Sequence, residues 1–323
     1  IILNNSDIKL TDMNSNQISL FKAKSLFASY RNNIIKVHSN FIHRASPNPI
    51  TLVYRGEFKD DKIESKIFIS GNSIKVPYSL LPDQMQNLKS NHMSLRVWLN
   101  LHDTKVTRAS GNISTDRLSM NIGKSIFTVE NINSDILFVK NNISETLSLM
   151  RMNYVINDKN ITNNKVVVSK DNKKNIKIFI KENGNKMIKE FLPILGIKKS
   201  DTLAQLFSSN IENIQLHLNN RGSLDYFSLS LVDTSINFDD NYSFKNINAR
   251  LYGTLLSGQI NIDNLSINQG DRSMLNNVSG EISYISKGKS IYFSSSNFAN
   301  NQNYNLSFSG YKTSKLPSIK LTI

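Results

Sequence analysis

Residues 93–101 alternate strictly between apolar side chains and mostly polar ones. Successive side chains of an extended chain point to opposite faces, so this stretch predicts a β-strand with one apolar face. The apolar positions are Met93, Leu95, Val97, Leu99 and Leu101. The other face is polar except for Trp98, which we expect either to serve an interface or to pack under a neighbouring loop. A chain built from such segments must fold as one-sided β-sheet.

The same alternation recurs along nearly the whole chain, at a spacing of roughly a dozen residues per strand. It is clearest in residues 211–323, and it predicts about twenty strands in total. Open twisted sheets of more than about ten strands tend to curl or split. The sequence therefore predicts an all-β fold, an elongated and strongly curled antiparallel sheet. Periodicity leaves open whether it closes around a filled interior or forms an apolar trough.

In one predicted strand the apolar residues switch from odd to even positions. Apolar residues occupy Leu147 and Leu149, and then Met150, Met152 and Tyr154. A single extra residue in one strand shifts alternation in this way, so the pattern predicts a β-bulge between Leu149 and Met150.

Two stretches interrupt the strands, near residues 77–91 and 186–209. Each contains a Leu-Pro pair and apolar residues at helical spacing, and Ser200 is a suitable N-cap, so we expect a few short helices there. These helices would either cap the trough or only pack on one end of the sheet. The interruptions divide one continuous β-groove segment, 1–323, into repeat-like blocks 1–92, 93–210 and 211–323.

Composition limits the possible partners and chemistries. The net charge of +14 indicates either a solvated basic surface or an anionic partner, and no nucleic-acid-binding motif accompanies it, so we expect no nucleic acid. The absence of cysteine excludes disulfides and thiol catalysis. No apolar run reaches the ~20 residues of a membrane span. Because the chain starts at Ile1 without Met, we expect an excised segment of a longer protein.

No catalytic or metal-binding constellation is recognisable. The five histidines form no HxH or HExxH pattern, and the paired aspartates at 60–61 and 239–240 fit turns. Neither a GxSxG nor a phosphate-binding loop occurs. We therefore expect no enzymatic activity, no cofactor and no metal.

Two long stretches resemble a known family. They are LLPDQMQNLKSNHMSLRVWLNLHDTKVTRASGNISTDRLSM and FLPILGIKKSDTLAQLFSSNIENIQLHLNNRGSLDYFSLSLVDTSINFDDNYSFKNINARLYGTLLSGQINID. A Leu-Pro segment followed by alternating leucines and turn-Gly strands resembles the AsmA-like bacterial envelope proteins, the YhdP branch in particular. The likeness covers about residues 18–323. The chain departs from that pattern in its sparse glycine, abundant asparagine and lack of an anchoring helix.

The resemblance implies a taco-like hydrophobic groove in the periplasm, within a parent anchored in the inner membrane. It implies a lipid-conducting role, carrying phospholipid between inner and outer membranes and supporting the outer-membrane barrier. The partners would be phospholipid acyl chains and the membranes at the two ends of the parent; the oligomeric state stays open. The alternative is a non-enzymatic structural or adhesive all-β surface protein with a packed core.

The groove hypothesis assigns its lining to alternate apolar positions. These are Leu95, Val97, Leu99, Leu101, Ile113, Met120, Ile214, Leu216, Leu218, Leu229, Leu231, Ile260, Ile262, Ile282, Tyr284, Leu306 and Phe308.

Overall fold

The computed structural model describes most of the chain as antiparallel β-sheet. The described residues are 1–11, 17–43, 48–59, 62–74, 88–90, 92–103, 105–122, 125–156, 159–181, 210–237, 242–287, 290–299, 305–312 and 317–322. Within these ranges all regular elements are strands, 21 in number. None of these residues belongs to a helix with the length and hydrophobicity of a membrane span. The all-β, antiparallel fold predicted from alternation is thus confirmed.

The chain divides into two compact units, Ile1–Val166 and Val167–Ile323. Strand β11 (Lys159–Asp171) contains the division. The units are described separately below. The three repeat-like blocks stay a prediction, and their boundaries do not coincide with this division.

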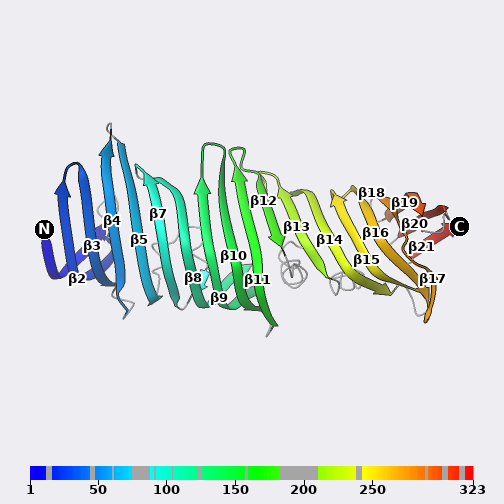
Figure 1. Ribbon diagram of the computed structural model, residues 1–323, viewed down its shortest axis with the longest axis horizontal. Helices are drawn as coiled ribbons and strands as arrows, with labels where there is room; N and C mark the ends of the chain where they lie inside the picture. Colours follow the sequence, from blue (N-terminus) through cyan, green and yellow to red (C-terminus); the bar gives the residue numbers. More distant parts are fainter. Residues whose placement is uncertain are drawn as a thin grey trace. The chain divides into compact units, whose positions relative to one another are not determined.

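Unit 1 is a sheet in which strands mostly pair in chain order, and Figure 1 shows β3, β4, β5 and β7 side by side. The pairing order is β1–β2–β3–β4–β5–β7–β8–β9–β10, and β6 pairs with β8. The strands are β1 (Ile2–Thr11), β2 (Gln17–Arg31), β3 (Ile34–His43), β4 (Ile50–Lys59), β5 (Lys62–Ile74), β6 (Leu88–Ser90), β7 (Met93–His102), β8 (Lys105–Ile122), β9 (Ser125–Lys140) and β10 (Ser144–Ile156).

Unit 2 repeats this arrangement. Its strands pair in the order β12–β13–β14–β15–β16–β18–β19–β20–β21, with β17 on β16. Among the described strands β1 and β21 each have one partner, so the sheet is not closed. The strands are β12 (Ile176–Lys181), β13 (Ile211–Leu218), β14 (Leu224–Asn237), β15 (Tyr242–Gly253), β16 (Ser257–Gln269), β17 (Arg272–Leu275), β18 (Ser279–Lys287), β19 (Ser290–Ala299), β20 (Asn305–Lys312) and β21 (Pro317–Thr322).

One part of the predicted helical interruptions is wrong. Residues 88–90, placed in the interruption near 77–91, form the short strand β6, in which Leu88 pairs with Met120 of β8. A backbone that reaches a free strand edge gains ladder hydrogen bonds, which outweigh weak helical spacing over so few residues. Residues 75–87 and 91, and all of 186–209, lie outside the described residues.

A line of bulges crosses unit 1 from strand to strand. The pairing register shifts between Ala23 and Ser25 in β2, between Gly71 and Ile74 in β5, and between Met150 and Asn153 in β10. These positions adjoin, because Ala23, Phe41, Ile50 and Gly71 are successive cross-strand partners, as are Ile74, Met93, Thr115 and Ile132. A bulge bends its strand, so the aligned bulges bend the sheet. We call this line the crease.

A bulge in β10 is confirmed, but it lies between Met150 and Asn153 and not, as predicted, between Leu149 and Met150. Met150 still pairs with Asp135 on the polar face, and Arg151 is the inserted residue, with φ of 50°. Met152 and Tyr154 then return to the apolar face, where both are buried.

Small polar side chains replace the backbone hydrogen bonds that the crease disrupts. The buried hydroxyls of Ser39, Thr115 and Ser134 donate to the carbonyls of Ser25, His92 and Met150, at 3.0, 2.7 and 3.2 Å. Buried backbone groups need such partners, so these residues explain how a bent sheet avoids orphaned carbonyls.

Unit 2 has a crease of its own. The pairing register shifts between Glu212 and Gln215 in β13, between Leu231 and Thr234 in β14, and between Lys245 and Asn248 in β15. Here the Asp233 amide donates to Asn248 Oδ1 at 3.0 Å. Both units therefore bend by the same device.

Candidate functional site

The apolar face of unit 1 carries two continuous cross-strand rows of side chains. Each row takes one residue from each of the six strands β4, β5, β7, β8, β9 and β10, and we call the two rows together the apolar wall. One row is Leu52–Ile69–Val97–Gly111–Ile136–Leu149, and the other is Tyr54–Ile67–Leu99–Ala109–Phe138–Leu147.

The apolar wall is only partly covered. Val97 and Ala109 are buried, whereas Ile67, Leu99 and Phe138 are only half-buried. No titratable side chain stands in either row apart from Tyr54, so the wall offers contact by dispersion and the hydrophobic effect, with no charged anchor.

The proposed lining residues of unit 1 lie together. Leu95 pairs with Ile113, Val97 with Gly111, and Leu99 with Ala109, which places them on one face of β7 and β8. Leu101 is on the same face opposite Val106, beyond a register shift. Met120 lies on β8, and its side chain is outside the described part of the chain.

The proposed lining residues of unit 2 also share a face. Leu229, Leu251, Ile260 and Ile282 form one cross-strand row, and Leu231, Ala249 and Ile262 form the next. Ile214 pairs with Ile180, and Leu218 pairs with Ile176. Ile180, Ile214, Leu231, Ala249 and Ile262 are buried, and Leu218, Leu229, Leu251, Ile260 and Ile282 are half-buried. Leu306 and Phe308 lie on β20, with side chains outside the described residues.

Tyr284 packs against Gly258. It follows Leu216, Phe227, Gly253 and Gly258 in a third row of unit 2. A Cβ atom on Gly258 would lie 2.5 Å from the Tyr284 hydroxyl, so only glycine leaves room for the ring. The hydroxyl donates to the Thr254 carbonyl at 2.8 Å, and burial raises the pKa of Tyr284.

Sequence reasoning found the strands of the wall, but only two of the twelve wall residues, Val97 and Leu99, were among the predicted lining residues. Leu52, Ile67, Ile69, Ile136 and Phe138 belong to the same rows as Val97 and Leu99. Alternation within each strand marked them as apolar, but only the pairing register shows which positions of six strands stand side by side.

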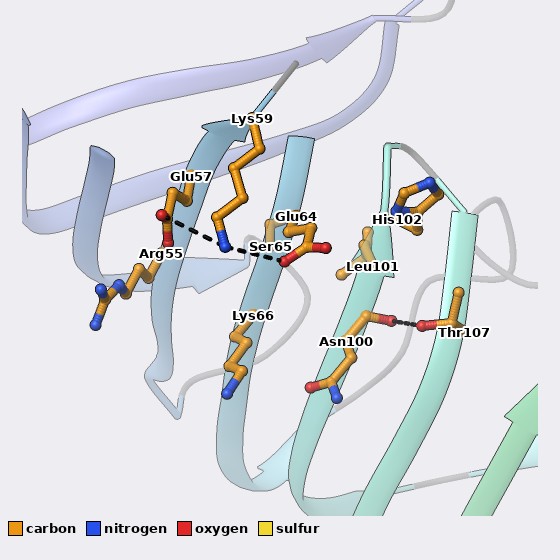
Figure 2. Close-up of a pocket in the computed structure, with 10 residues that line it drawn as sticks. All are labelled: Arg55, Glu57, Lys59, Glu64, Ser65, Lys66, Asn100, Leu101, His102 and Thr107. Atoms are coloured by element: carbon orange, nitrogen blue, oxygen red, sulfur yellow. Dashed lines mark hydrogen bonds and ion pairs between the residues drawn. The ribbon is translucent and has the colours of Figure 1, made fainter. Parts of the chain in front are cut away.

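Unit 1 also has a hollow at the β4–β5 and β7–β8 hairpin ends, shown in Figure 2, with a volume of about 650 Å³. Its lining is Arg55, Glu57, Lys59, Glu64, Ser65, Lys66, Asn100, Leu101, His102 and Thr107. Lys59 Nζ lies 3.6 Å from Glu57 Oε1 and 3.7 Å from Glu64 Oε2. Exposed ion pairs of this kind stabilise by only about 0–1 kcal/mol.

The hollow does not present an arrangement for acid–base or metal chemistry. Both carboxylates face the same ammonium group, and among the described residues no three His, Asp or Glu side chains converge as metal ligands do. The apolar wall of unit 1 and the apolar rows of unit 2 are therefore stronger candidate sites than the hollow. Comparison with protein-family models, with curated proteins and with solved structures found no match for the chain.

Proposed function

We propose that the apolar face of the sheet binds phospholipid acyl chains and conducts them along its length. The observation that carries the proposal is the apolar wall, a pair of unbroken rows across six strands, half-covered and on a sheet that is not closed. Burying an acyl chain is worth about 0.8 kcal/mol per CH₂, so a surface of this kind can compensate for removal from a bilayer only if most of the chain is covered.

Uniformity of the wall supports movement as well as binding. Ile67, Leu99, Ala109 and Phe138 follow one another along one row and are all apolar, so an acyl chain displaced by one strand exchanges one set of apolar contacts for another. Without a charged residue in the rows there is no deep minimum to hold the chain in place. The head group would stay at the open side of the sheet.

The resemblance to AsmA-like envelope proteins supports the setting that we infer for this surface. In that reading the chain is a periplasmic segment of a parent anchored in the inner membrane, and it serves passage of phospholipid to the outer membrane. A taco-like groove is part of this proposal, and it requires that the half-covered wall be reachable by a hydrocarbon tail.

Site-specific photo-crosslinking tests the proposal. A photoreactive amino acid at Leu99 faces the apolar wall, whereas the same group at Asn100 faces the opposite side of the same strand. Leu216 and Gln215 form a second matched pair, in unit 2. We expect lipid adducts, identified by mass spectrometry, at 99 and 216 and not at 100 and 215. Equal labelling within both pairs, or none at 99 and 216, would refute the proposal.

A charge on the wall gives a complementary test. Val97 is buried, so an aspartate there would test folding as much as binding. Leu99→Asp is better placed because Leu99 is half-buried, and Asn100→Asp is its control. Leu99→Asp should remove phospholipid that co-purifies in native mass spectrometry, while Asn100→Asp retains it. A wild-type chain that is uniformly lipid-free, with a wall inaccessible to hydrocarbon, would favour a packed all-β surface protein instead.

A further inference from the structure

A row of apolar side chains also crosses the opposite, polar face of unit 1. Ile2, Phe27, His38, Val53, Phe68 and Trp98 are successive cross-strand partners on β1, β2, β3, β4, β5 and β7. We call this set the outer row. Since neighbouring strands are about 4.8 Å apart, it extends about 24 Å. All its members except His38 are apolar, whereas most other side chains on this face are polar.

The outer row is open to solvent. Ile2, Phe27, Val53 and Trp98 are 71%, 49%, 38% and 52% exposed. The Phe68 and Trp98 rings contact each other with centroids 4.6 Å apart. Single exposed apolar residues are ordinary, but a contiguous line of them marks an interaction surface.

A row of cations runs beside it. Its members are exposed: Lys36, Arg55, Lys66 and Arg108. The first three each lie two positions along the strand from a residue of the outer row. Arg108 lies two positions from Ser110, which is the cross-strand partner of Trp98. Two positions correspond to about 6.6 Å. Within the described part of the chain none of the four forms an ion pair, since the nearby Glu57 and Glu64 both face Lys59.

This pairing of features points to one kind of occupant. Tryptophan and other apolar side chains beside lysine and arginine are typical of protein surfaces that lie in the headgroup region of a bilayer. Anionic headgroups would meet the cations while the outer row enters the interface. A nucleic acid suits the site less well, because the aliphatic Ile2 and Val53 offer no ring on which a base could stack.

We propose that the outer row and its neighbouring cations dock unit 1 onto an anionic phospholipid surface. This site is on the face opposite the apolar wall, so it does not depend on acyl-chain binding there. The chain also supplies its own reporter, since Trp98 is its single tryptophan and belongs to the outer row.

Fluorescence of Trp98 in the intact chain tests the proposal. Vesicles of phosphatidylcholine with phosphatidylglycerol should shift the emission to shorter wavelength and protect it from acrylamide, and high salt should reverse both effects. Vesicles of phosphatidylcholine alone should have much less effect. The proposal would be overturned if the anionic vesicles left the Trp98 emission unshifted. If polyglutamate or single-stranded DNA shifted the emission and the vesicles did not, the partner would be a different polyanion.

Charge-removal variants locate the contact. Arg55→Gln with Lys66→Gln should weaken anionic-vesicle affinity by about an order of magnitude, because each cation near an anionic surface contributes separately. The matched control is Lys245→Gln with Arg250→Gln, which removes two exposed cations of β15 in unit 2 and should leave affinity nearly unchanged. Val53→Ser, at an exposed position, should reduce the shift of Trp98 while the chain stays folded. Equal losses in the two double variants would mean that net charge alone drives binding, and would overturn a defined docking site.

Discussion

The crease and the apolar wall of unit 1 are built from the same alternation, on the same strands, yet they are covered very differently. At the crease Ile74, Met152 and Tyr154 are 3%, 6% and 3% exposed. On the wall Val97 and Ala109 are buried too, but Ile67, Leu99 and Phe138 of the same sheet are only half-buried. Both sets are apolar and both face the same side, so hydrophobicity does not distinguish them.

The difference arises from backbone geometry. A bulge bends the strand, and the apolar side chains of Ile74, Met152 and Tyr154 beside the bulges are enclosed. Farther from the bulge, along each arm of the strand, the face opens. A long strand can therefore keep a packed, stabilising region at its bend and an accessible surface on its arm, and the lipid-binding proposal concerns only the second.

The sharpest test of this comparison uses two isoleucines of one strand. Ile74 lies at the crease, against Gly71, and Ile67 lies on the wall, and both belong to β5. Ile74→Ala should lower the free energy of unfolding by about 3 kcal/mol, because it leaves a cavity in an enclosed site. Ile67→Ala should lower it by about 1 kcal/mol, since its surroundings are already open. Denaturant unfolding measures both, and equal losses would show that the wall is as closely packed as the crease.

Two tyrosines give a pH-dependent version of the test. Burial raises the pKa of Tyr154, at the crease, to about 12, and the Asn164 side chain offsets this only in part. The folded state thus favours the neutral phenol. The stabilisation that the folded state gains from this preference is complete below pH 10, the ordinary pKa of tyrosine. It is lost as the pH rises through about 12.

Tyr154→Phe should remove this loss, which amounts to about 2 to 3 kcal/mol for two pKa units. Among the described residues the Tyr154 hydroxyl has no well-aligned hydrogen-bond partner, so the variant should be little changed at neutral pH. Tyr284→Phe, on the more open face of unit 2, is the control and should change the alkaline slope less. Unfolding followed between pH 8 and 12 would contradict the comparison if both variants behaved alike.

Alternation predicted the strands, their one-sidedness and the bulge in β10, because each is a property of a single segment. It could not predict the rest of the crease or the outer row. The shifts at Ala23–Ser25 and Gly71–Ile74 appear only when two strands are paired, and Phe27 reaches Trp98 only through four intervening registers. The residues of the predicted helices between 186 and 209 are not among those described, so those helices stay a prediction.

Asparagine was the available signal for the crease, and its substitution gives the smallest of the expected effects. Asparagine is common in turns, but Asn131 and Asn213 have φ of 51° and 50° inside strands β9 and β13. Glycine adopts this left-handed conformation most easily, and among the residues that have a side chain asparagine is one of the few that tolerate it. Alanine at either position should therefore cost about 1 kcal/mol, whereas glycine should cost almost nothing. Asn133→Ala, in β9 and exposed, is the control. If alanine at 131 or 213 proves as harmless as at 133, the bend does not depend on these residues, and the enclosed character of the crease must come from side-chain packing alone.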